Sequence, residues 1–592
     1  MSVSRGEAPL LGVVDYTVFA LMLSVSAAIG VYYGFFARSS GADDYLVGGR
    51  SMSTIPVSMS LIASFISGIM LLGIATESYL YGMQYAYVCV GVILSAAINA
   101  FAFLPVFYDL GITSTYEYLD MRFGRSARLL GSFFFVTFTL VWIPIVIYVP
   151  AVAFNQVTGI NIHIVSCAVC VVCIFYTCVG GIKAVVWTDV VQTVFMFGGV
   201  LLVIFKGTAD VGGFGVVWSR NLESGRIEPP VLDPDPTVRT ALPSLVLGGA
   251  IHWLAVSGIH QMMIQRYMSL PSLSKANRAL CIFTVGSVCL VLICSYCGLL
   301  MYARYYDCDP LTTKMARAKD QLLPLMVADS LGGFPGLPGL FVASVFSAAL
   351  SSLSTALNSM SAVVLEDFWK AFFPSRRLSE RQTDLLMKGV VVAVGVLCTA
   401  LVFVVEKMGS AVLQMAISLG SMSHGPSLAL FTTGMFFPWV NAKSAIVGSM
   451  TGMGMMGWLV IGTQLHQARG NIGFATKPLS TSGCLYEFDH SQNGTVAVSS
   501  DFCTSEMWAV YCVSYLWYTA LGLVTSVTVS LVASIFLRQD ASRPDARLIS
   551  PLVRRWLPPA SRAQIYKVVE METMPAIEQR KVYDPPDNAL SQ

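Results

Sequence analysis

Long apolar segments recur along the whole chain and are separated by shorter polar stretches. A helix needs about 20 predominantly apolar residues to cross the hydrocarbon core of a bilayer. The pattern predicts thirteen membrane-spanning helices, at residues 13–36, 55–80, 84–107, 128–153, 163–180, 184–205, 242–265, 279–302, 334–365, 387–405, 411–437, 443–463 and 507–537. We therefore expect an all-α polytopic membrane protein whose transmembrane domain covers residues 13–537.

The composition excludes most other classes of protein. Of the 592 residues, 55% are apolar and 12% are charged, whereas soluble domains carry roughly 25% charged residues. So few charged side chains could not cover several soluble domains, which excludes a soluble enzyme, a fibrous protein and a disordered scaffold. The net charge of +2 creates no field that would attract nucleic acid. The bilayer is the expected partner, and almost all charged residues are expected to lie outside it.

An odd number of crossings puts the two termini on opposite sides of the membrane. Lys and Arg are more numerous on the side of the C-terminal tail, which the positive-inside rule assigns to the cytosol. We expect residues 1–12 to be extracellular and residues 538–592 to form a cytosolic, mostly disordered tail. The loop 464–506 is then extracellular, and it holds a glycosylation acceptor at Asn493 and two cysteines, Cys484 and Cys503, that an oxidising exterior would allow to pair.

The chain carries no catalytic signature. A G-x-x-x-x-G-K-[ST] phosphate-binding loop, a G-x-S-x-G nucleophile motif and an H-E-x-x-H zinc motif are all absent from the sequence. Three histidines lie within apolar segments, His252, His260 and His424, but they do not follow the spacing of metal ligands along the chain. We expect a protein that is not an enzyme and that takes energy for transport from an ion gradient.

The ninth apolar segment carries a stripe of small and hydroxyl side chains. Ser344, Ser347, Ser351 and Thr355 recur at helical spacing, and Ser352 lies beside them. A lone hydroxyl in a membrane helix usually bonds to its own backbone or to a neighbouring helix. A stripe of this density favours a hydrated path or a site for a monovalent cation, since hydroxyl and carbonyl oxygens can replace the water around such an ion.

Two other segments are interrupted by glycine. In the second, Gly68 and Gly73 follow a hydroxyl-rich stretch, so the helix could unwind there and free carbonyls for an ion. The alternative is a close-packing face made of Ser64 and Gly68, and the spacing does not decide between the two. The seventh segment is interrupted in the same way around Gly258. Two broken helices, five segments apart, indicate an inverted repeat with a site at its interface.

Several longer motifs resemble one family. They are Val106-Phe-Tyr-Asp-Leu-Gly-Ile-Thr-Ser-Thr-Tyr-Glu-Tyr-Leu, Tyr176-Thr-Cys-Val-Gly-Gly-Ile-Lys-Ala-Val-Val-Trp-Thr-Asp, Gln265-Arg-Tyr, Cys308-Asp-Pro-Leu, Asp320-Gln-Leu-Leu-Pro and Pro335-Gly-Leu-Pro-Gly-Leu-Phe-Val-Ala-Ser-Val-Phe-Ser-Ala-Ala-Leu-Ser-Ser. In this order they resemble the sodium/solute symporters, and within them the branch of sodium-coupled monocarboxylate, multivitamin and iodide transporters. The resemblance covers nearly the whole chain up to the tail.

The resemblance implies a LeuT-type inverted-repeat fold of about 13 transmembrane helices, with the N-terminus outside and the C-terminus inside. The two repeats would cover about residues 53–206 and 242–437. It also implies Na⁺ as the coupling ion, with a sodium site formed by the carbonyls of Ala63, Ile66 and Ala348 and the hydroxyls of Ser351 and Ser352.

The residues expected to contact the solute depart from the family pattern. By resemblance they are Met70, Gly73, Trp253, Ser257, His260 and Ser418. Met70, Ser257 and His260 replace other residue types of the family, and His424 stands where a small residue is expected, whereas Trp253 is retained. The solute is therefore not identified by the resemblance.

Two acidic residues are expected to have structural roles rather than to bind the ion or the solute. Asp189, which follows Thr188, is expected to cap the inner end of the sixth helix. Glu77, beyond the expected helix break, is expected to be a structural partner in the outer half-helix.

Together these features predict a plasma-membrane Na⁺-coupled symporter that imports a small organic anion, with a monocarboxylate as the first choice, by alternating access. The alternatives are a multivitamin- or iodide-type anion symporter, and a transporter-like protein that has lost coupling and acts as a sensor or a leak pathway.

Overall fold

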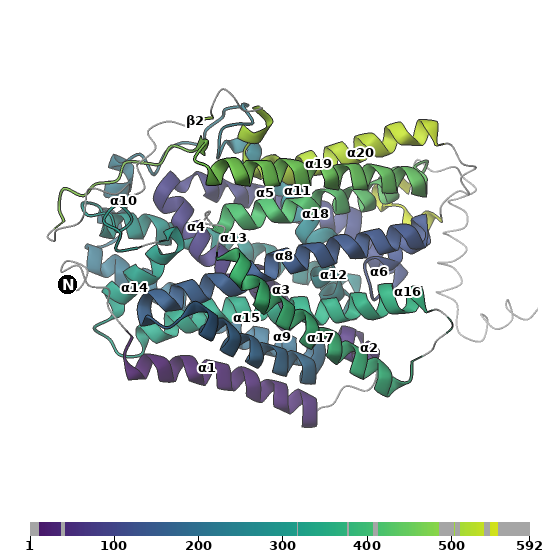
Figure 1. Cartoon of the computed structure of the whole chain (residues 1–592), viewed down its shortest axis with the longest axis horizontal. Coiled ribbons are helices and arrows are strands. Elements are labelled where there is room, and N and C mark those ends of the chain that lie inside the picture. The colour runs from purple at the N-terminus through teal and green to yellow at the C-terminus, as the bar shows by residue number, and fades with distance from the viewer. Residues whose placement is uncertain are drawn as a thin grey trace, which may run out of the picture.

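The computed structural model describes residues 11–36, 42–316, 318–373, 375, 378–406, 412–484, 502–503, 509–537 and 545–554. The long bundle is built from helices α1 (Val13–Val31), α3 (Thr54–Phe65), α4 (Gly68–Tyr81), α5 (Val88–Ile98), α6 (Leu104–Leu110), α8 (Arg125–Thr158), α9 (Ile162–Val211), α11 (Gly249–Leu254), α12 (Gln261–Met268), α13 (Leu273–Arg304), α15 (Leu337–Val363), α17 (Glu380–Val405), α18 (Val412–Phe436), α19 (Ala442–Ala468) and α20 (Tyr518–Phe536). Most of these helices run roughly parallel to the long axis of the molecule (Figure 1).

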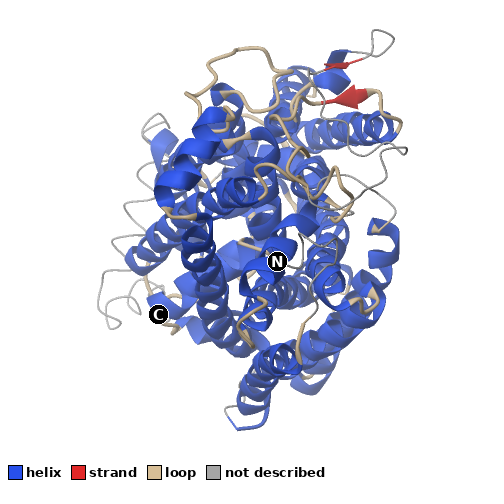
Figure 2. Cartoon of the chain, turned by 90° about the vertical axis from the view of Figure 1, so that its left-hand side faces the viewer, coloured by secondary structure: helices blue, strands red, loops and turns tan. Residues whose placement is uncertain are grey.

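Shorter elements lie at the two ends of the bundle. They are α2 (Ala42–Val47), α7 (Glu117–Phe123), α10 (Phe214–Glu223), α14 (Leu322–Leu331), α16 (Lys370–Phe372), α21 (Pro551–Arg554) and the strands β1 (Ile472–Gly473) and β2 (Phe502–Cys503), which pair antiparallel. Loops and both strands gather at the end that carries the N-terminus (Figure 2).

Within the described residues, nine helices are long and apolar enough to cross a membrane, and α3 with α4 form a further candidate that is bent by 57°. One of the nine, α9, has 50 residues and contains the non-helical Gly181 at φ 58°, which lies between two of the predicted segments. The seventh predicted segment corresponds to a shorter apolar helix, Ser244–Ile259. Every predicted apolar segment therefore coincides with helical structure, and the all-α membrane fold is confirmed.

Both predicted helix breaks are present. Between α3 and α4, Ile66 leaves the helical region at φ −90° and ψ 76°, and Ser67 is extended. In the seventh segment the π-helical turn η7 (Ala255–Ile259) is followed by an extended His260, at φ −72° and ψ 132°, before α12 begins. Gly68 and Gly73 lie within α4 rather than in the break. The backbone therefore opens just before the two glycines, and of the two only Gly73 lies where a Cβ would be too close to a neighbouring helix.

The hydroxyl-rich helix α15 lies at the centre of the bundle. It packs against α9, α8, α1, α17 and α3. Its N-terminus is held by a carboxylate from α1, since Asp15 accepts hydrogen bonds from the amides of Gly336 and Gly339, both at 2.9 Å. A negative charge at that position satisfies amides that have no partner within the helix. The first helix thereby fixes where α15 begins.

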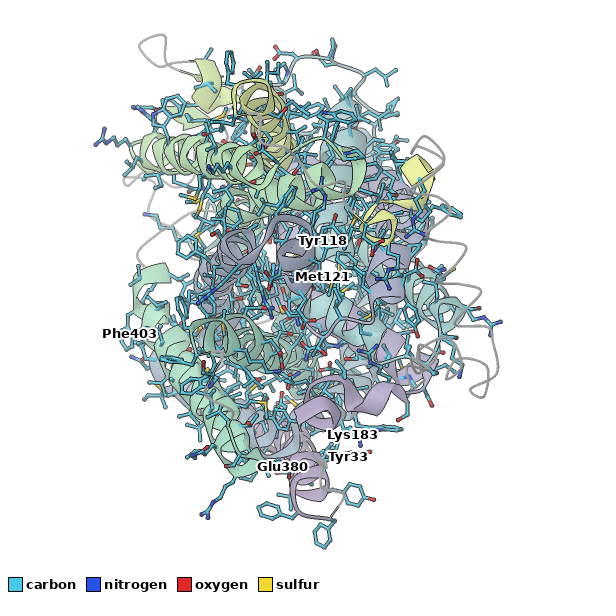
Figure 3. All side chains as sticks on the ribbon, turned by 90° about the vertical axis from the view of Figure 1, so that its right-hand side faces the viewer. Tyr33, Tyr118, Met121, Lys183, Glu380 and Phe403 are labelled. Atoms are coloured by element: carbon cyan, nitrogen blue, oxygen red, sulfur yellow. A yellow bond between two sulfur atoms is a disulfide. The ribbon has the colours of Figure 1, made fainter. Side chains whose placement is uncertain are left out.

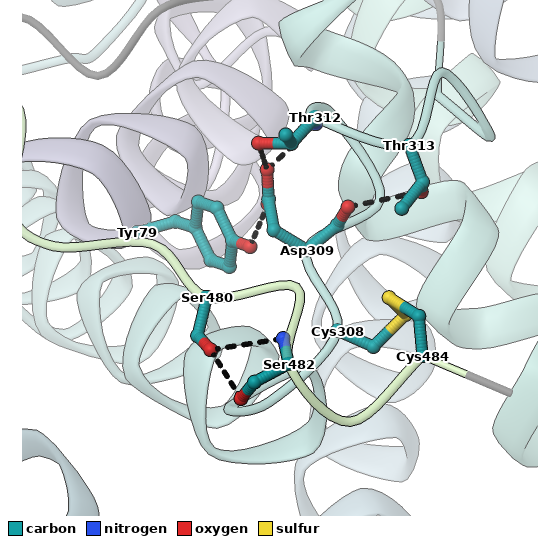
Figure 4. Close-up of a disulfide and its surroundings, with 8 residues drawn as sticks. All are labelled: Tyr79, Cys308, Asp309, Thr312, Thr313, Ser480, Ser482 and Cys484. Carbon is teal, nitrogen blue, oxygen red and sulfur yellow. Dashed lines mark hydrogen bonds between the residues drawn. A yellow bond between two sulfur atoms is a disulfide. The ribbon is translucent and has the colours of Figure 1, made fainter. Parts of the chain in front are cut away.

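A disulfide joins the loop after α13 to the loop after α19. Cys308 and Cys484 are bonded (Figure 4), so the predicted Cys484–Cys503 pair is wrong. The reason is that the loop after α19 packs on the loop after α13, which places Cys484 beside Cys308. The amide of Asp309 donates to the Ser480 carbonyl at 2.9 Å, and the amide of Gly483 donates to the Asp307 carbonyl at 2.9 Å. Cys512 is disulfide-bonded as well. The predicted glycosylation site, Asn493, lies outside the described residues.

At the other end, part of the tail is folded. Residues 545–554 form a short 3₁₀ turn and α21, which bury Leu548 and Ile549. Tyr118, which lies near the middle of that end in Figure 3, donates to the Leu548 carbonyl at 3.0 Å, and Ser550 donates to the Ala102 carbonyl at 2.9 Å. The expectation of disorder from residue 538 is therefore wrong for this segment, because apolar burial and backbone hydrogen bonds hold it.

Candidate functional site

The break between α3 and α4 lies against the hydroxyl stripe of α15. The Ser352 hydroxyl lies 2.7 Å from the Ser64 carbonyl and 3.1 Å from the Ala348 carbonyl, and can donate to either. The Ser64 hydroxyl in turn lies 3.3 Å from the Ser351 hydroxyl and 2.8 Å from that of Thr355. The structure thus brings oxygen atoms from two helices, nearly 300 residues apart in sequence, into one small buried cluster.

All five residues expected to bind sodium lie at or beside this cluster. Ala63 flanks Ser64 on α3, Ile66 is at the break, and Ala348, Ser351 and Ser352 face them from α15; each is at most 1% exposed. Carbonyl and hydroxyl oxygens are ligands that suit a hard monovalent cation. The end of α3 supplies carbonyls that no longer need to bond within a helix.

A buried ion pair that the sequence did not predict lies next to this cluster. Arg266 of α12 donates to Asp189 of α9 at 3.0 Å and to the Ser60 hydroxyl at 2.7 Å, and it also contacts Thr355. Asp189 accepts from Ser60 at 2.5 Å and from Ser64 at 3.3 Å. Asp189 therefore does not cap a helix end, since it lies inside α9 and bonds to two other helices.

Both members of this pair lie in the interior of the protein. Asp189 is 0% exposed and Arg266 is 2% exposed. A charged residue within or beside an apolar segment requires a partner. Arg266, which directly follows the seventh apolar segment, was the sequence feature that could have indicated a buried ion pair. The sequence alone could not name Asp189 as the partner because the two residues are 77 positions apart.

A cavity of about 60 Å³ opens on the other side of the helix break. It is mainly apolar and aromatic, and no Asp, Glu, Lys or Arg is among the described residues that line it. These residues come from α3, α4, α8, α11, α18 and the adjoining turns: Phe65, Ser67, Ile69, Met70, Phe138, Trp142, His252, Trp253, Val256, Leu413, Ala416, Ile417 and His424. Of the expected solute contacts, Met70 and Trp253 line this cavity.

The remaining expected contacts lie elsewhere. Gly73 packs closely against α18, since a Cβ added there would lie 2.8 Å from the Cβ of Leu413. Ser257 is buried beside Asn99, which donates to its carbonyl at 2.9 Å. Ser418 lies within α18, where its carbonyl accepts from Ser421 at 2.6 Å. His260 is separated from the cavity by ring contacts with Phe138 and His424, at 4.9 and 5.7 Å between centroids.

Near the N-terminal end of the molecule, Glu77 of α4 is bound by Arg239 through two hydrogen bonds of 2.9 Å each. Arg239 also donates to Gln414 of α18 at 2.9 Å. Burial alone would lower the pKa of Arg239, but the charge of Glu77 and the hydrogen bond to it, together with Tyr81 and Tyr515, raise that pKa above its usual value. The expectation that Glu77 is a structural partner agrees with this contact.

Comparison with known proteins identifies the family. The family model described as the sodium:solute symporter family matches residues 45–452. The human sodium-coupled monocarboxylate transporter 1 is 38% identical over 552 residues, which cover 90% of this chain and 89% of that protein. The chain belongs to the sodium:solute symporter family.

Other members of this symporter family are similar to a comparable degree. The human sodium/iodide cotransporter is 37% identical, over 89% of this chain and 84% of its own. The sodium-dependent multivitamin transporter of Oryctolagus cuniculus is 38% identical, over 92% of this chain and 86% of its own. These relatives are sodium-coupled transporters, so the symporter described here is a multi-pass membrane transporter and not an enzyme.

The fold is shared with solved symporters. The structure of a Na⁺-coupled sialic acid symporter in a substrate-bound, outward-open state matches with a TM-score of 0.72 at 23% identity, over 89% of this chain and 98% of that one. Mhp1, a transporter of the nucleobase-cation-symport-1 family, matches with a TM-score of 0.52 at 12% identity, over 86% of this chain and 98% of its own. At these identities the likeness concerns the fold alone.

Proposed function

We propose that this symporter couples the entry of Na⁺ to the import of a small organic anion, with a monocarboxylate as the first choice. The names of the similar proteins support Na⁺ coupling, and three of them name different solutes: monocarboxylates, iodide and vitamins. The ion would be held by the carbonyls of Ala63, Ile66 and Ala348 and the hydroxyls of Ser351 and Ser352. The solute would occupy the cavity between Met70 and Trp253.

The observation that carries this proposal is the helix break shared by the two sites. The break begins at Ile66, two residues after Ser64 of the oxygen cluster, and the next residue, Ser67, lines the cavity. An ion that joined α3 to α15 would fix the backbone of the break, and with it one wall of the cavity. Binding of the ion would then favour binding of the solute, and by linkage the reverse would also hold.

We further propose thirteen crossings of the plasma membrane, in which inverted repeats of about residues 53–206 and 242–437 form the transporter core. The N-terminus would be outside and the C-terminus inside. Disulfides persist in oxidising compartments, and Cys308 pairs with Cys484 in two loops that this orientation places outside. With this orientation each net positive charge that moves inward gains about 2.3 kcal/mol per 100 mV.

The test is uptake of a radiolabelled short monocarboxylate into cells that express the protein, with and without external Na⁺. We expect Ser351→Ala and Ser352→Ala each to abolish Na⁺-dependent uptake, or to raise the half-saturating Na⁺ concentration by about tenfold, which corresponds to the loss of one good ligand oxygen. Ser361→Ala is the matched control, since Ser361 is a buried serine of the same helix that bonds only to the Asn358 carbonyl.

Surface biotinylation shows that each variant reaches the membrane. Unchanged Na⁺ dependence in both Ser351→Ala and Ser352→Ala would contradict the ion site. Na⁺ current that persists without accumulation of any solute would favour an uncoupled leak pathway instead. Iodide and a vitamin, tested beside the carboxylates, decide between the solute classes.

A further inference from the structure

Three histidines from distant parts of the sequence meet next to the cavity. His252 comes from α11, His260 from the break before α12, and His424 from α18, and α11 contacts α18 directly. The ring centroid of His424 lies 5.5 Å from that of His252 and 5.7 Å from that of His260. His424 is therefore the middle member of a row of three imidazoles, although spacing along the chain gave no sign of it.

Two of these histidines have no hydrogen-bond partner. Both ring nitrogens of His260 and both of His424 are buried without a partner in the described structure, and each side chain is 5% exposed. His252 does have one, since its Nδ1 lies 3.1 Å from the Thr519 hydroxyl. Buried polar groups in proteins are normally paired, and an imidazole carries at least one N–H donor. Unpaired donors beside a cavity indicate that something else accepts from them.

The surroundings restrict what that acceptor can be. His252 and His424 line the cavity together with Trp142, Trp253 and Met70, and no charged side chain is among the described residues that line it. Aromatic rings pack on the histidines as well, with Phe138 4.4 Å from His424 between centroids. A carboxylate has oxygen acceptors for the N–H groups, and a short hydrocarbon chain fits the apolar wall.

Two other occupants fit less well. Among the described residues no group of three or more His, Cys, Asp and Glu side chains is arranged to hold a metal ion, which argues against a transition metal. Iodide is a spherical and weak hydrogen-bond acceptor, so it gains little from directional N–H donors. Two N–H···O bonds of about 2.9 Å each can bridge donors nearly 6 Å apart, a separation comparable to the 5.5 Å between the centroids of His424 and His252, which both line the cavity.

We propose that His424, supported by His252 and His260, recognises the carboxylate of the transported solute. The His424 N–H donates to one carboxylate oxygen, and His252, which also lines the cavity, donates to the same carboxylate. The aliphatic part of the solute packs on Trp253 and Met70. This inference rests on the proposed function and makes it more specific: the solute is a short aliphatic monocarboxylate, and imidazole donors take the place of a basic side chain.

The first experiment measures binding without transport. Purified full-length protein in detergent with Na⁺ is titrated with propionate, and its thermal stabilisation gives the apparent Kd. We expect His424→Phe, which keeps an aromatic ring but removes the donor, to weaken binding by at least about tenfold, as for the loss of a hydrogen bond to a charged group. His424→Gln, which keeps an N–H donor, should retain part of the affinity. His466→Phe, at the end of α19, is the matched control and should not change it.

The second experiment measures Na⁺-dependent propionate uptake in cells. We expect His424→Phe and His252→Phe to raise KM, while Na⁺-induced charge movement in the absence of solute stays as in the unmodified protein. That charge movement also shows that the variants are folded. If the Kd and the KM for propionate stay within about twofold of the unmodified protein in both variants, the inference is overturned. The proposal of Na⁺ symport would then still stand. Propionate binding that depends on His424 without any Na⁺-driven uptake would support the inference and contradict the proposed function.

Discussion

The guanidinium of Arg266 is surrounded by oxygen atoms deep inside the bundle, from Asp189, Ser60 and Thr355. Asp189 also accepts from the Ser64 hydroxyl, which belongs to the cluster at the helix break. A buried ion pair contributes little net stability, yet the loss of one partner leaves an uncompensated charge, at a cost of about 3–5 kcal/mol. At the scale of single residues, this pair is therefore expected to be sensitive to the loss of either partner.

We expect Asp189→Asn to reduce the free energy of unfolding by about 3–5 kcal/mol, since Arg266 would then be buried without a counter-charge. Thermal unfolding of the detergent-solubilised protein measures the loss. The double variant Asp189→Asn/Arg266→Gln should recover part of it, because neither charge remains. Lys206→Gln is the control. Lys206 forms a partly exposed ion pair with Asp210, and its loss should lower the free energy of unfolding by only about 0–1 kcal/mol. Similar losses in Asp189→Asn and Lys206→Gln would contradict the assignment.

At the scale of elements, Arg239 ties the C-terminal part of α4 to α18. It binds Glu77 with both arms of its guanidinium and donates to Gln414. The same group lies over the rings of Tyr81, Phe474 and Tyr515, between 4.2 and 5.1 Å from their centroids. These contacts hold together two of the helices that line the cavity, and they use the planar shape of the guanidinium as well as its charge.

Arg239→Lys should therefore lower the stability of the protein although it keeps the charge. A lysine cannot make two parallel hydrogen bonds to Glu77 or stack on the surrounding rings, so we expect a loss of about 2–4 kcal/mol in the free energy of unfolding. Thermal unfolding again provides the measurement. Arg278→Lys is the matched control, since Arg278 is exposed. If both substitutions behave alike, the bidentate and stacking contacts are not important for stability.

Sequence patterns predicted those features that depend on local spacing. The hydroxyl stripe of α15 follows from residues three and four apart, and the two helix breaks follow from glycine and hydroxyl residues within apolar segments. Contacts between distant segments were not predictable in this way. The rings of His252 and His424 are in contact although they belong to different helices, and Asp189 bonds to Arg266, which lies 77 positions later in the sequence. Such contacts depend on how whole helices pack, which a single sequence does not reveal.

At the scale of the whole molecule, the disulfide between Cys308 and Cys484 closes a loop across a sequence separation of 176 residues. The bond stands in a network that includes Asp309, which accepts from Tyr79 and from Thr312 (Figure 4). Prediction from the sequence chose Cys503 as the partner because it lies in the same loop as Cys484. The observed pairing requires two loops to meet, and nothing in local spacing encodes that.

We expect Cys308→Ser and Cys484→Ser each to lower the thermal unfolding temperature. In the chain-entropy model a loop of this length is worth about 5 kcal/mol. The double variant should lose no more than either single variant, because only one bond is involved. Cys281→Ser is the control, since Cys281 is a free, exposed cysteine. A double variant clearly less stable than both single ones would show that the two sulfurs act independently. A membrane-impermeant reductant applied to intact cells should reproduce the effect if the bond faces outward.

The same bond also changes the covalent topology of the chain. The segment between Cys308 and Cys484 contains α15 and α18, which carry most of the oxygen cluster and part of the cavity wall. A protease that cuts once anywhere within this segment, on either side of the membrane, would leave two fragments that are still joined through sulfur. The nicked protein would migrate as one species until it is reduced, and its central helices would stay attached to both the N-terminal and the C-terminal parts of the bundle.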